Sequence, residues 1–280
     1  MKLVLQGPGA DQAALARIAA LAQPRSTTAL NQHALRCDGI EVTPALKAAV
    51  EAAAFEARID ASFVDAGLSL ADFKLVAMDM DSTLITIECI DEIADMQGLK
   101  PQVSAITEAA MRGELDFSES LKRRVALLAG LPVEALGRVY DERLAISMGG
   151  EAMLAAVRAA GLRTLLVSGG FTFFTERLKP RLGLDYTHAN VLEAEDGKLT
   201  GRVLGGIVDA EEKQRTVERV CAELGIEPRQ AIVMGDGAND LKMMGIAGLS
   251  VAFRAKPVVR AQADIALNFC GLDGVLAVLS

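Results

Sequence analysis

Most of the chain alternates short, mostly apolar runs with longer stretches in which apolar residues recur every three or four positions. The runs at 75–78, 163–167 and 231–234 are bounded by loop residues, which indicates buried strands. The stretches at 172–182 and 210–224 have the spacing of amphipathic helices. Strands that alternate with helices favour a parallel sheet covered by helices. We therefore expect the α/β fold class.

A long helical segment separates the first of these strands from the second. Residues 88–148 contain four stretches with helical periodicity, at 89–96, 103–112, 117–128 and 133–144. Glycine or proline interrupts the periodicity between them, at Gly98, Gly113 and Gly130-Leu131-Pro132. We expect a compact helical cap at about 88–148, inserted after the first core strand.

Residues 1–70 have a different pattern, with short β-prone runs and two helical stretches. The second stretch, at 43–57, is rich in alanine and begins with Thr43 and Pro44, residue types that favour the N-cap and the first helical position. We expect a small α+β domain at 1–70, near the lower size limit for independent folding. A second domain at 71–280 would contain the cap.

Composition narrows the classes of partner. The chain has 280 residues and a formal net charge of −8, so we do not expect a broad nucleic-acid surface. No apolar run approaches the roughly 20 residues of a membrane span. The first apolar run is too short for a signal peptide, so we expect a cytoplasmic protein with no membrane partner. The four cysteines and two histidines show no metal-ligand spacing, which disfavours zinc binding and histidine-based catalysis.

Two carboxylates, Asp79 and Asp81, follow directly after the apolar run at 75–78. In open α/β sheets, ligands bind at the carboxyl ends of the strands. A carboxylate pair there could hold a hard cation such as Mg²⁺, or divide nucleophilic attack and proton transfer between its members. Alone, an Asp-x-Asp sequence is more often a pair of solvated loop acids. The interpretation therefore depends on the other strand ends.

Two of those ends offer phosphate chemistry. Ser168-Gly169-Gly170 follows the run at 163–167 and could present a hydroxyl and unencumbered backbone N–H groups to a phosphate. A plain glycine turn explains the same residues equally well. Lys213 lies in the first turn of the helix at 210–224, where a lysine opposes the helix dipole. A nearby anion explains that position better, and a solvated lysine is the alternative.

The last strand end completes the set. Asp236 stands between two glycines after the run at 231–234, and Asn239 and Asp240 follow it closely. Flanking glycines let the backbone approach a metal ligand closely. Chance could produce any one of these features, but it is a poor explanation for all of them in order along the chain. Together they predict a phosphoryl-transfer site.

At this point the sequence resembles the haloacid dehalogenase (HAD) superfamily, and within it the phosphatases that hydrolyse phosphoserine. The resemblance runs from about residue 73 to the C-terminus and rests on three segments that occur together: Asp79-Met80-Asp81-Ser82-Thr83-Leu84, Val167-Ser168-Gly169-Gly170-Phe171 and Gly235-Asp236-Gly237-Ala238-Asn239-Asp240. It implies a Rossmann-like core with a parallel sheet. The domain at 1–70 is similar in size and rough pattern to the ACT-like extension of some members.

The resemblance also implies a role for each site residue. Asp79 would attack phosphorus and form an aspartyl-phosphate, while Asp81 would protonate the leaving oxygen and later take a proton from water. Mg²⁺ would be held by the Asp79 carboxylate, the Asp81 backbone carbonyl and Asp236. Asp240 would support the site without touching the substrate. The phosphoryl oxygens would be bound by Ser168, Gly169, Gly170, Lys213 and Asn239.

Three cap residues fall where the family reads its substrate. Glu88 would meet the ammonium group of O-phospho-L-serine, and Arg124 would hold its carboxylate. Phe117 is seven positions before Arg124, so it would pack beside it on nearly the same helix face. The basic run at 122–124 is otherwise typical of a solvated helix face. Consecutive helical residues point about 100° apart, so at most one or two of them could face a site.

The implied activity is Mg²⁺-dependent hydrolysis of O-phospho-L-serine to L-serine and phosphate, the last step of serine biosynthesis. The resemblance leaves a homodimer open. One alternative is a HAD phosphotransferase or phosphatase for another small phosphorylated metabolite. Transfer from phosphoserine to homoserine, for example, would keep every site residue named here. A non-catalytic amino-acid sensor is a second alternative, but the intact Asp79, Asp81, Lys213 and Asp236 argue against it.

Overall fold

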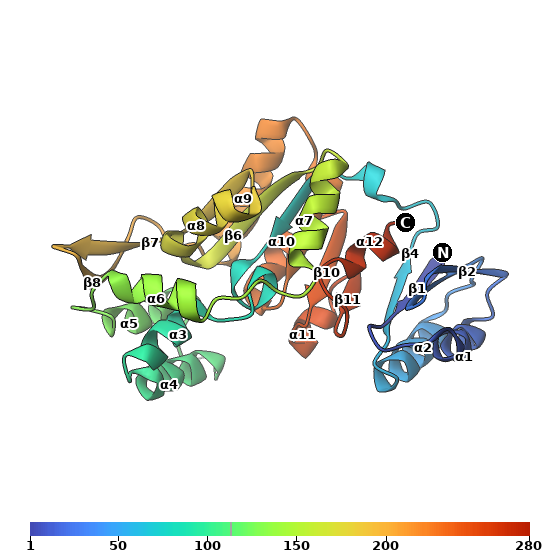
Figure 1. Cartoon of the computed structure of the whole chain (residues 1–280), viewed down its shortest axis with the longest axis horizontal. Coiled ribbons are helices and arrows are strands. Elements are labelled where there is room, and N and C mark those ends of the chain that lie inside the picture. Colours follow the sequence, from blue (N-terminus) through green and yellow to red (C-terminus); the bar gives the residue numbers. More distant parts are fainter. Residues whose placement is uncertain (113) are drawn as a thin grey trace.

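The computed structural model describes residues 1–112 and 114–280, so the predicted break at Gly113 lies outside the described residues. Its largest element is a seven-stranded sheet in the order β11-β10-β9-β5-β6-β7-β8 (Figure 1). The three strands expected from apolar runs are neighbours within it, as β9-β5-β6. The strands of this sheet are β5 (Leu75–Met78), β6 (Arg163–Phe171), β7 (Tyr186–Glu195), β8 (Lys198–Leu204), β9 (Ala231–Gly235), β10 (Leu249–Phe253) and β11 (Ile265–Leu267).

The central strands are parallel and buried on both faces. β5 pairs in parallel with β6 on one side and with β9 on the other. Successive side chains point to opposite faces, so Leu75 lies in one apolar cluster and Val76 in another. Helix α9 (Ala210–Leu224) covers the first face, and α7 (Gly150–Ala159) and α8 (Thr172–Leu182) cover the second. Burial on both faces explains why these strands are continuous apolar runs.

Two details concern the edge of the sheet. β7 and β8 are antiparallel and meet at the predicted hairpin turn, where Asp196 and Gly197 have φ of 49° and 76°. Glycine adopts such angles at no steric cost. β6, however, does not end at Val167 as predicted. It continues to Phe171, with an irregular register against β7 after Val167. The Ser168-Gly169-Gly170 segment therefore lies in an irregular strand end, not in a free turn.

The predicted cap lies between β5 and β6 in sequence and beside the β7–β8 hairpin in space, at the end of the molecule away from the N-terminus (Figure 1). Its residues Leu121 and Val125 belong to the same apolar cluster as one face of the sheet. The second cap helix begins at Lys100 instead of 103, because Pro101 is accommodated in its first turn. The cap helices are α3 (Cys89–Met96), α4 (Lys100–Met111), α5 (Phe117–Ala126) and α6 (Glu134–Glu142).

The shorter helices of the core are α10 (Leu241–Gly245), α11 (Pro257–Arg260) and α12 (Gly274–Val278). α10 follows β9, α11 follows β10, and α12 ends close to the C-terminus. Across the described residues, no helix is both long enough and apolar enough to cross a membrane.

Residues 2–64 form a four-stranded antiparallel sheet in the order β2-β3-β1-β4, with two helices, and we call this the N-terminal unit. Thr43 Oγ1 accepts a hydrogen bond from the N–H of Leu46 at 3.1 Å, and Pro44 begins the helix, as predicted. The domain boundaries at 1–70 and 71–280 stay a prediction. The elements of the unit are β1 (Lys2–Gln6), α1 (Gln12–Ala22), β2 (Ser26–Asn31), β3 (Ala34–Asp38), α2 (Pro44–Glu56) and β4 (Asp60–Val64).

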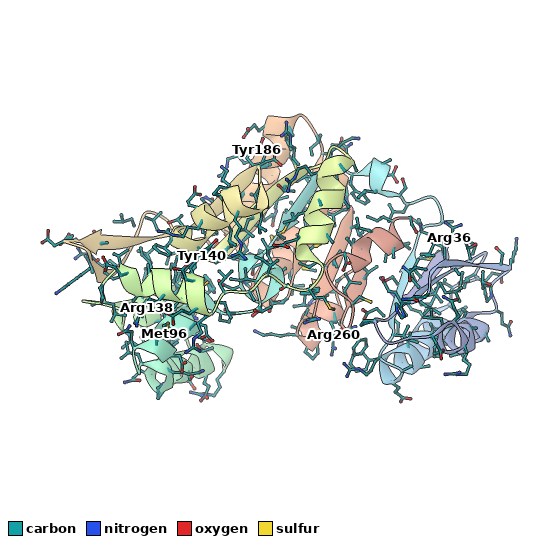
Figure 2. The ribbon with its side chains drawn as sticks, viewed as in Figure 1. Arg36, Met96, Arg138, Tyr140, Tyr186 and Arg260 are labelled. Carbon is teal, nitrogen blue, oxygen red and sulfur yellow. The ribbon has the colours of Figure 1, made fainter. Side chains whose placement is uncertain are left out.

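A buried carboxylate attaches the N-terminal unit to the core. Asp60 is 1% exposed and accepts hydrogen bonds from the backbone N–H groups of Asn268 at 2.7 Å, Phe269 at 3.1 Å and Cys270 at 2.9 Å. These residues follow β11, so β4 lies beside the edge of the large sheet. Figure 2 labels Arg260 on the side of the core that faces the N-terminal unit.

Candidate active site

Asp79 begins the loop that follows β5, and only 5% of its surface is exposed. Its backbone N–H donates to the carbonyl oxygen of Met234 at 3.0 Å, and its carboxylate accepts from the N–H of Met80 at 2.7 Å. The chain turns at Ser82, whose φ of 55° is unfavourable for a residue with a side chain. The loop thereby holds Asp79 and Asp81 at the carboxyl edge of the sheet.

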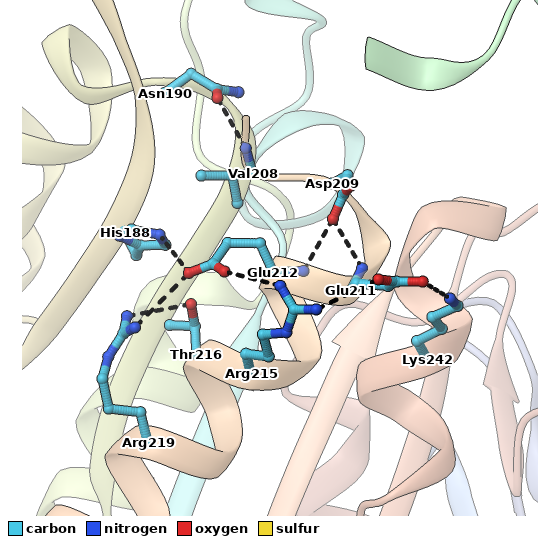
Figure 3. Close-up of polar contacts among 10 residues, drawn as sticks. All are labelled: His188, Asn190, Val208, Asp209, Glu211, Glu212, Arg215, Thr216, Arg219 and Lys242. Carbon is cyan, nitrogen blue, oxygen red and sulfur yellow. Dashed lines mark hydrogen bonds and ion pairs between the residues drawn. The ribbon is translucent and has the colours of Figure 1, made fainter. Parts of the chain in front are cut away.

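Lys213 lies in the first turn of α9, and none of its side chain is exposed. Its Nζ lies 2.7 Å from Oδ2 of Asp79 and 2.8 Å from Oδ1 of Asp240. Asp209 caps the same helix end by accepting two backbone hydrogen bonds (Figure 3). An ammonium beside the positive end of a helix dipole is costly, and the two carboxylates offset that cost.

A third carboxylate, Asp236, follows β9. Asp240 Oδ2 accepts from the N–H groups of Asp236 at 3.1 Å and Gly237 at 3.0 Å, and Thr83 Oγ1 donates to Asp236 Oδ1 at 3.2 Å. One oxygen from each of Asp79, Asp236 and Asp240 lies within 4.8 Å of the others. We call these three residues the acidic cluster. Their oxygens form a donor set that could hold a metal ion.

Negative charge exceeds positive charge here, because the acidic cluster has three carboxylates and Lys213 pairs with two of them. Burial raises the pKa of Asp79 well above its ordinary range, and Asp240 raises it further, while Lys213 opposes both. Burial and Asp240 likewise raise the pKa of Asp236 to about 6. Burial alone would lower the pKa of Lys213, but Asp240 and Asp79 outweigh it and the pKa is raised. A cation among these carboxylates would relieve their repulsion.

Asp81 is not a member of the acidic cluster. Its Oδ1 accepts from the N–H of Cys89, at the start of α3, at 3.1 Å. Burial, followed by repulsion from Glu88, raises the pKa of Asp81 to about 7. A side-chain carbon built on Gly170 would lie 2.5 Å from Oδ2 of Asp81, so only glycine permits this approach. Asp81 therefore lies between the cap and the end of β6, with a carboxyl group that can exchange a proton near neutral pH.

The end of β6 also supplies a hydroxyl. Ser168 is 1% exposed, and its Oγ accepts from the N–H of Gly170 at 2.8 Å. The expectation that both glycine N–H groups are unencumbered is therefore wrong for Gly170, because its own neighbour uses that donor. Gly169 lies against the cap, since a side-chain carbon built there would be 2.9 Å from Cζ of Phe117. The Phe117 ring thus covers the backbone at Gly169.

Asn190 on β7 contacts the end of β6, and the sequence analysis did not predict this role. It is 1% exposed, and its Nδ2 donates to the carbonyl oxygen of Gly169 at 2.7 Å. Its Oδ1 accepts from the N–H of Val208 at 2.9 Å, the contact drawn in Figure 3. Val208 lies just before the N-cap of α9, the helix that contains Lys213. The buried amide of Asn190 therefore joins the end of β6 to the start of α9. Its surroundings in the sequence, Thr187-His188-Ala189 before it and Val191-Leu192-Glu193 after it, mix polar and apolar residues and give no signal of this role.

The basic run on α5 divides as the helical geometry requires. Lys122 and Arg123 are exposed, whereas Arg124 is half-buried. Arg123 Nε pairs with Glu119 at 2.7 Å on the outer face. The Nε of Arg124 is buried and has no hydrogen-bond partner among the described residues. Of the three, Arg124 is the one directed inward.

The charges near Arg124 are acidic. Burial lowers its pKa, and Asp91 and then Glu88 oppose that effect. Glu88 is exposed, and its Oε1 accepts from the hydroxyl of Ser82 at 2.7 Å. Asn239 is half-buried, and its side chain makes no hydrogen bond within the described ranges. Packing of Phe117 beside Arg124 stays a prediction.

The family model of haloacid dehalogenase-like hydrolases matches residues 76–245. The chain belongs to this family. The matched range contains the acidic cluster, Lys213 and the whole cap, so this HAD chain is a hydrolase with the family's core and an inserted cap. Phosphatases of this family typically use a metal ion, and the acidic cluster supplies carboxylates for one.

Similarity to known proteins extends beyond the range that the family model matches. A phosphoserine phosphatase of Polaromonas sp. is 59% identical over 214 residues, which cover 75% of this chain and 91% of the relative. The crystal structure of a HAD family hydrolase from Salmonella enterica subsp. enterica serovar Typhi matches with a TM-score of 0.91 at 33% identity, over 100% of this chain and 99% of that one. A probable phosphoserine phosphatase from Vibrio cholerae, in unliganded form, has a TM-score of 0.84 at 36% identity, over 99% and 86%.

Proposed function

We propose that this HAD hydrolase removes the phosphate from O-phospho-L-serine in a Mg²⁺-dependent reaction and releases L-serine. The observation that carries the proposal is the buried pair of Asp79 and Lys213, set among the carboxylates of Asp236 and Asp240. The name of the Polaromonas relative, phosphoserine phosphatase, supports the choice of substrate.

Mg²⁺ suits the acidic cluster because it prefers oxygen ligands and is usually bound by one or two carboxylates plus a phosphate. Asp79 and Asp236 would hold it with the backbone carbonyl of Asp81, and Asp240 would hold Lys213 from behind. Bound there, the ion would neutralise negative charge on the nucleophile and the substrate. The raised pKa values of Asp79 and Asp236 support this assignment.

Asp79 is the group that attacks phosphorus. Lys213 stays protonated between two carboxylates and orients Oδ2 of Asp79 at 2.7 Å. An oxygen of Asp79 forms a bond to phosphorus as the bond from phosphorus to the serine oxygen breaks, which leaves an acyl phosphate. Water then attacks phosphorus and the acyl-phosphate bond breaks. This step regenerates the Asp79 carboxylate and releases inorganic phosphate.

Asp81 moves the proton in both halves of the reaction. Serine alkoxide is a poor leaving group, so Asp81 protonates the serine oxygen as it departs. It then takes a proton from the attacking water, which restores its starting state. A pKa of about 7 suits this exchange, because a general acid that is also a general base works best near the operating pH.

The phosphoryl oxygens would be bound by Lys213, the Ser168 hydroxyl, the Gly169 N–H and Asn239. The Gly170 N–H would join them once the Ser168 hydroxyl turns toward the phosphate, because the two are bonded to each other in the free protein. Several donors aimed at the same oxygens stabilise the charge that develops there.

The cap would select serine. The buried Nε of Arg124 has no partner among the described residues, so a substrate carboxylate would satisfy it. Glu88 would attract the substrate ammonium, and the Phe117 ring over Gly169 would help to exclude water. Groups that bind phosphate alone cannot distinguish serine from other alcohols.

The test is phosphate release from O-phospho-L-serine with and without Mg²⁺, against a panel of other phosphomonoesters. We expect Mg²⁺-dependent release that Asp79→Asn abolishes, and an acid-quenched intermediate with an acyl phosphate on Asp79. Phosphate recovered on serine or histidine would contradict the mechanism. Added homoserine separates hydrolysis from transfer by the appearance of a phosphorylated product, and a non-catalytic sensor would release no phosphate.

A further inference from the structure

A cleft opens along the seam between the N-terminal unit and the core. It encloses about 440 Å³. Phe55 and Arg58, at the end of α2, line it from one side, and Arg254, Arg260 and Phe269 line it from the other. Arg254 directly follows β10, and Arg260, which is labelled in Figure 2, ends α11. None of these residues belongs to the acidic cluster.

Three arginines line this cleft, of which Arg58 and Arg254 are exposed and Arg260 is half-buried. Among the described residues, no Asp or Glu oxygen lies within 4.0 Å of Arg58, Arg254 or Arg260. Within the part of the chain that the structure describes, Arg260 donates only to Oδ1 of Asn268, at 3.4 Å. The buried carboxylate of Asp60 is already occupied by backbone N–H groups. Three positive charges along one cleft, none within 4.0 Å of a described carboxylate, favour an anion there.

Two phenyl rings support these arginines. The ring centroids of Phe55 and Phe269 are 5.3 Å apart. Cζ of Arg58 lies 5.1 Å from the centroid of Phe269, and Cζ of Arg260 lies 5.3 Å from that of Phe55. Stacking on a ring leaves the N–H groups at the edge of a guanidinium free for an anion. Phe55 is also 48% exposed, so apolar ring surface lies next to the positive charges.

Arg58 reaches the cleft from the turn that ends α2. Its φ is 56°, in the left-handed region, and the N–H of Ile59 donates to the carbonyl oxygen of Ala54 at 2.8 Å. This is an ordinary turn at a helix C-terminus, so the helix end accounts for the backbone of Arg58. Arg254, with φ of 45°, directly follows β10.

We propose that this cleft binds a small organic anion that has at least two negative charges and a planar apolar part. Guanidinium groups match the oxygens of a carboxylate or a phosphate in paired hydrogen bonds. The exposed ring of Phe55 matches the planar part. The volume falls within the usual range of small-molecule pockets, roughly 300–1,000 Å³.

Calorimetric titration of the full chain in saturating Mg²⁺ tests the proposal. Benzene-1,3,5-tricarboxylate serves as the carboxylate probe and phenylphosphonate, which has no phosphoester bond to hydrolyse, as the phosphorus probe. We expect at least one probe to bind at one site per chain, and the stronger probe identifies the preferred anion. Arg58→Gln and Arg260→Gln should each weaken that binding about tenfold, the effect of losing one charge-assisted interaction. Arg138→Gln, on the exposed face of α6, is the matched control and should change nothing.

Asp79→Asn separates the cleft from the candidate active site and should leave probe binding intact. The chain has no tryptophan, so Phe55→Trp adds a single indole that should report binding with the same dissociation constant as the heat signal. This second measurement does not depend on the folding of the arginine variants. Binding that Asp79→Asn abolishes, or that Arg58→Gln and Arg260→Gln leave unchanged, overturns the proposal. A dimer that Arg58→Gln dissociates overturns it as well, because the cleft would then be an interface between two copies.

Discussion

The side-chain amide of Asn190 donates a hydrogen bond to the carbonyl oxygen of Gly169 at 2.7 Å. The same amide accepts from the N–H of Val208 at 2.9 Å, immediately before the N-cap of α9. Asn190 thus connects the strand end that contains Ser168 to the helix that contains Lys213. Neither contact involves the substrate, so its proposed effect on turnover is one of position.

Asn190→Ala should lower turnover by about 10–100-fold, because a displacement of about 1 Å in a reacting group can cost this much. It should also lower the free energy of unfolding by about 1–3 kcal/mol for each backbone group left unpaired. Steady-state kinetics and urea unfolding measure the two effects. Thr187→Ala, which removes an exposed hydrogen bond to Glu176 from the same strand, is the control. Loss of stability with normal turnover would limit Asn190 to a structural role.

Asp81→Asn should slow phosphoserine hydrolysis by roughly two to four orders of magnitude, the usual contribution of general acid–base catalysis. Mg²⁺ affinity should change much less, because the Asp81 side chain lies outside the acidic cluster. Kinetics and calorimetric titration with Mg²⁺ give both quantities on one variant. An equal fall in metal affinity and rate would mean that the Asp81 carboxylate is itself a ligand.

Arg124→Ala should lower kcat/KM for phosphoserine by about 2–5 kcal/mol, as for truncation of one partner in a buried charge pair. Phosphoethanolamine lacks the carboxylate, so its kcat/KM should fall far less. Arg123→Ala is the matched control, because Arg123 is exposed and already paired with Glu119. Similar losses for both substrates in Arg124→Ala would show that Arg124 does not read the carboxylate.

Mg²⁺ affinity should depend on pH through the acidic cluster. The pKa of Asp236 is raised to about 6 and that of Asp79 is raised well above its ordinary range, so protons compete with the metal as pH falls through about 6. Each carboxylate that must lose a proton weakens binding about tenfold per pH unit below its pKa. Calorimetric titration at pH 5, 6, 7 and 8 measures this dependence. Equal affinity at pH 5 and pH 8 would exclude these residues as ligands.

The stability of the metal-free protein should fall as pH rises, whereas Mg²⁺ affinity should increase. A carboxyl group whose pKa is raised by folding binds a proton more tightly in the folded protein than in the unfolded chain. The metal-free protein should therefore become more stable as pH falls through about 6 toward the ordinary pKa of a carboxyl group. It should become less stable as pH rises above about 6. Mg²⁺ should raise the thermal midpoint more at pH 8 than at pH 5. Scanning calorimetry with EDTA or Mg²⁺ at both pH values tests the sign.

The sequence by itself determined the order of the elements and most residues of the candidate site. Runs such as 75–78 are apolar because both faces of the sheet are covered, and this pattern is local, so it is visible without a structure. Asp79, Ser168 and Asp236 were found because parallel strands bring their carboxyl ends to one edge, a rule of topology that needs no coordinates. Helical spacing likewise limited how many residues of the run 122–124 could turn inward.

Only the tertiary structure decided how those residues are paired. Lys213 contacts Asp240 across 27 positions, and Asn190 contacts Gly169 across 21, so neither contact follows from local pattern. β6 continues past Val167 because β7 pairs with it again at Phe171, and strand length depends on the neighbouring strand. The cleft lined by Arg58, Arg254 and Arg260 likewise forms between the N-terminal unit and the core, which contact each other through Asp60 and the loop after β11. Such contacts form between packed elements, and periodicity in one element cannot specify which residue of another will lie opposite it.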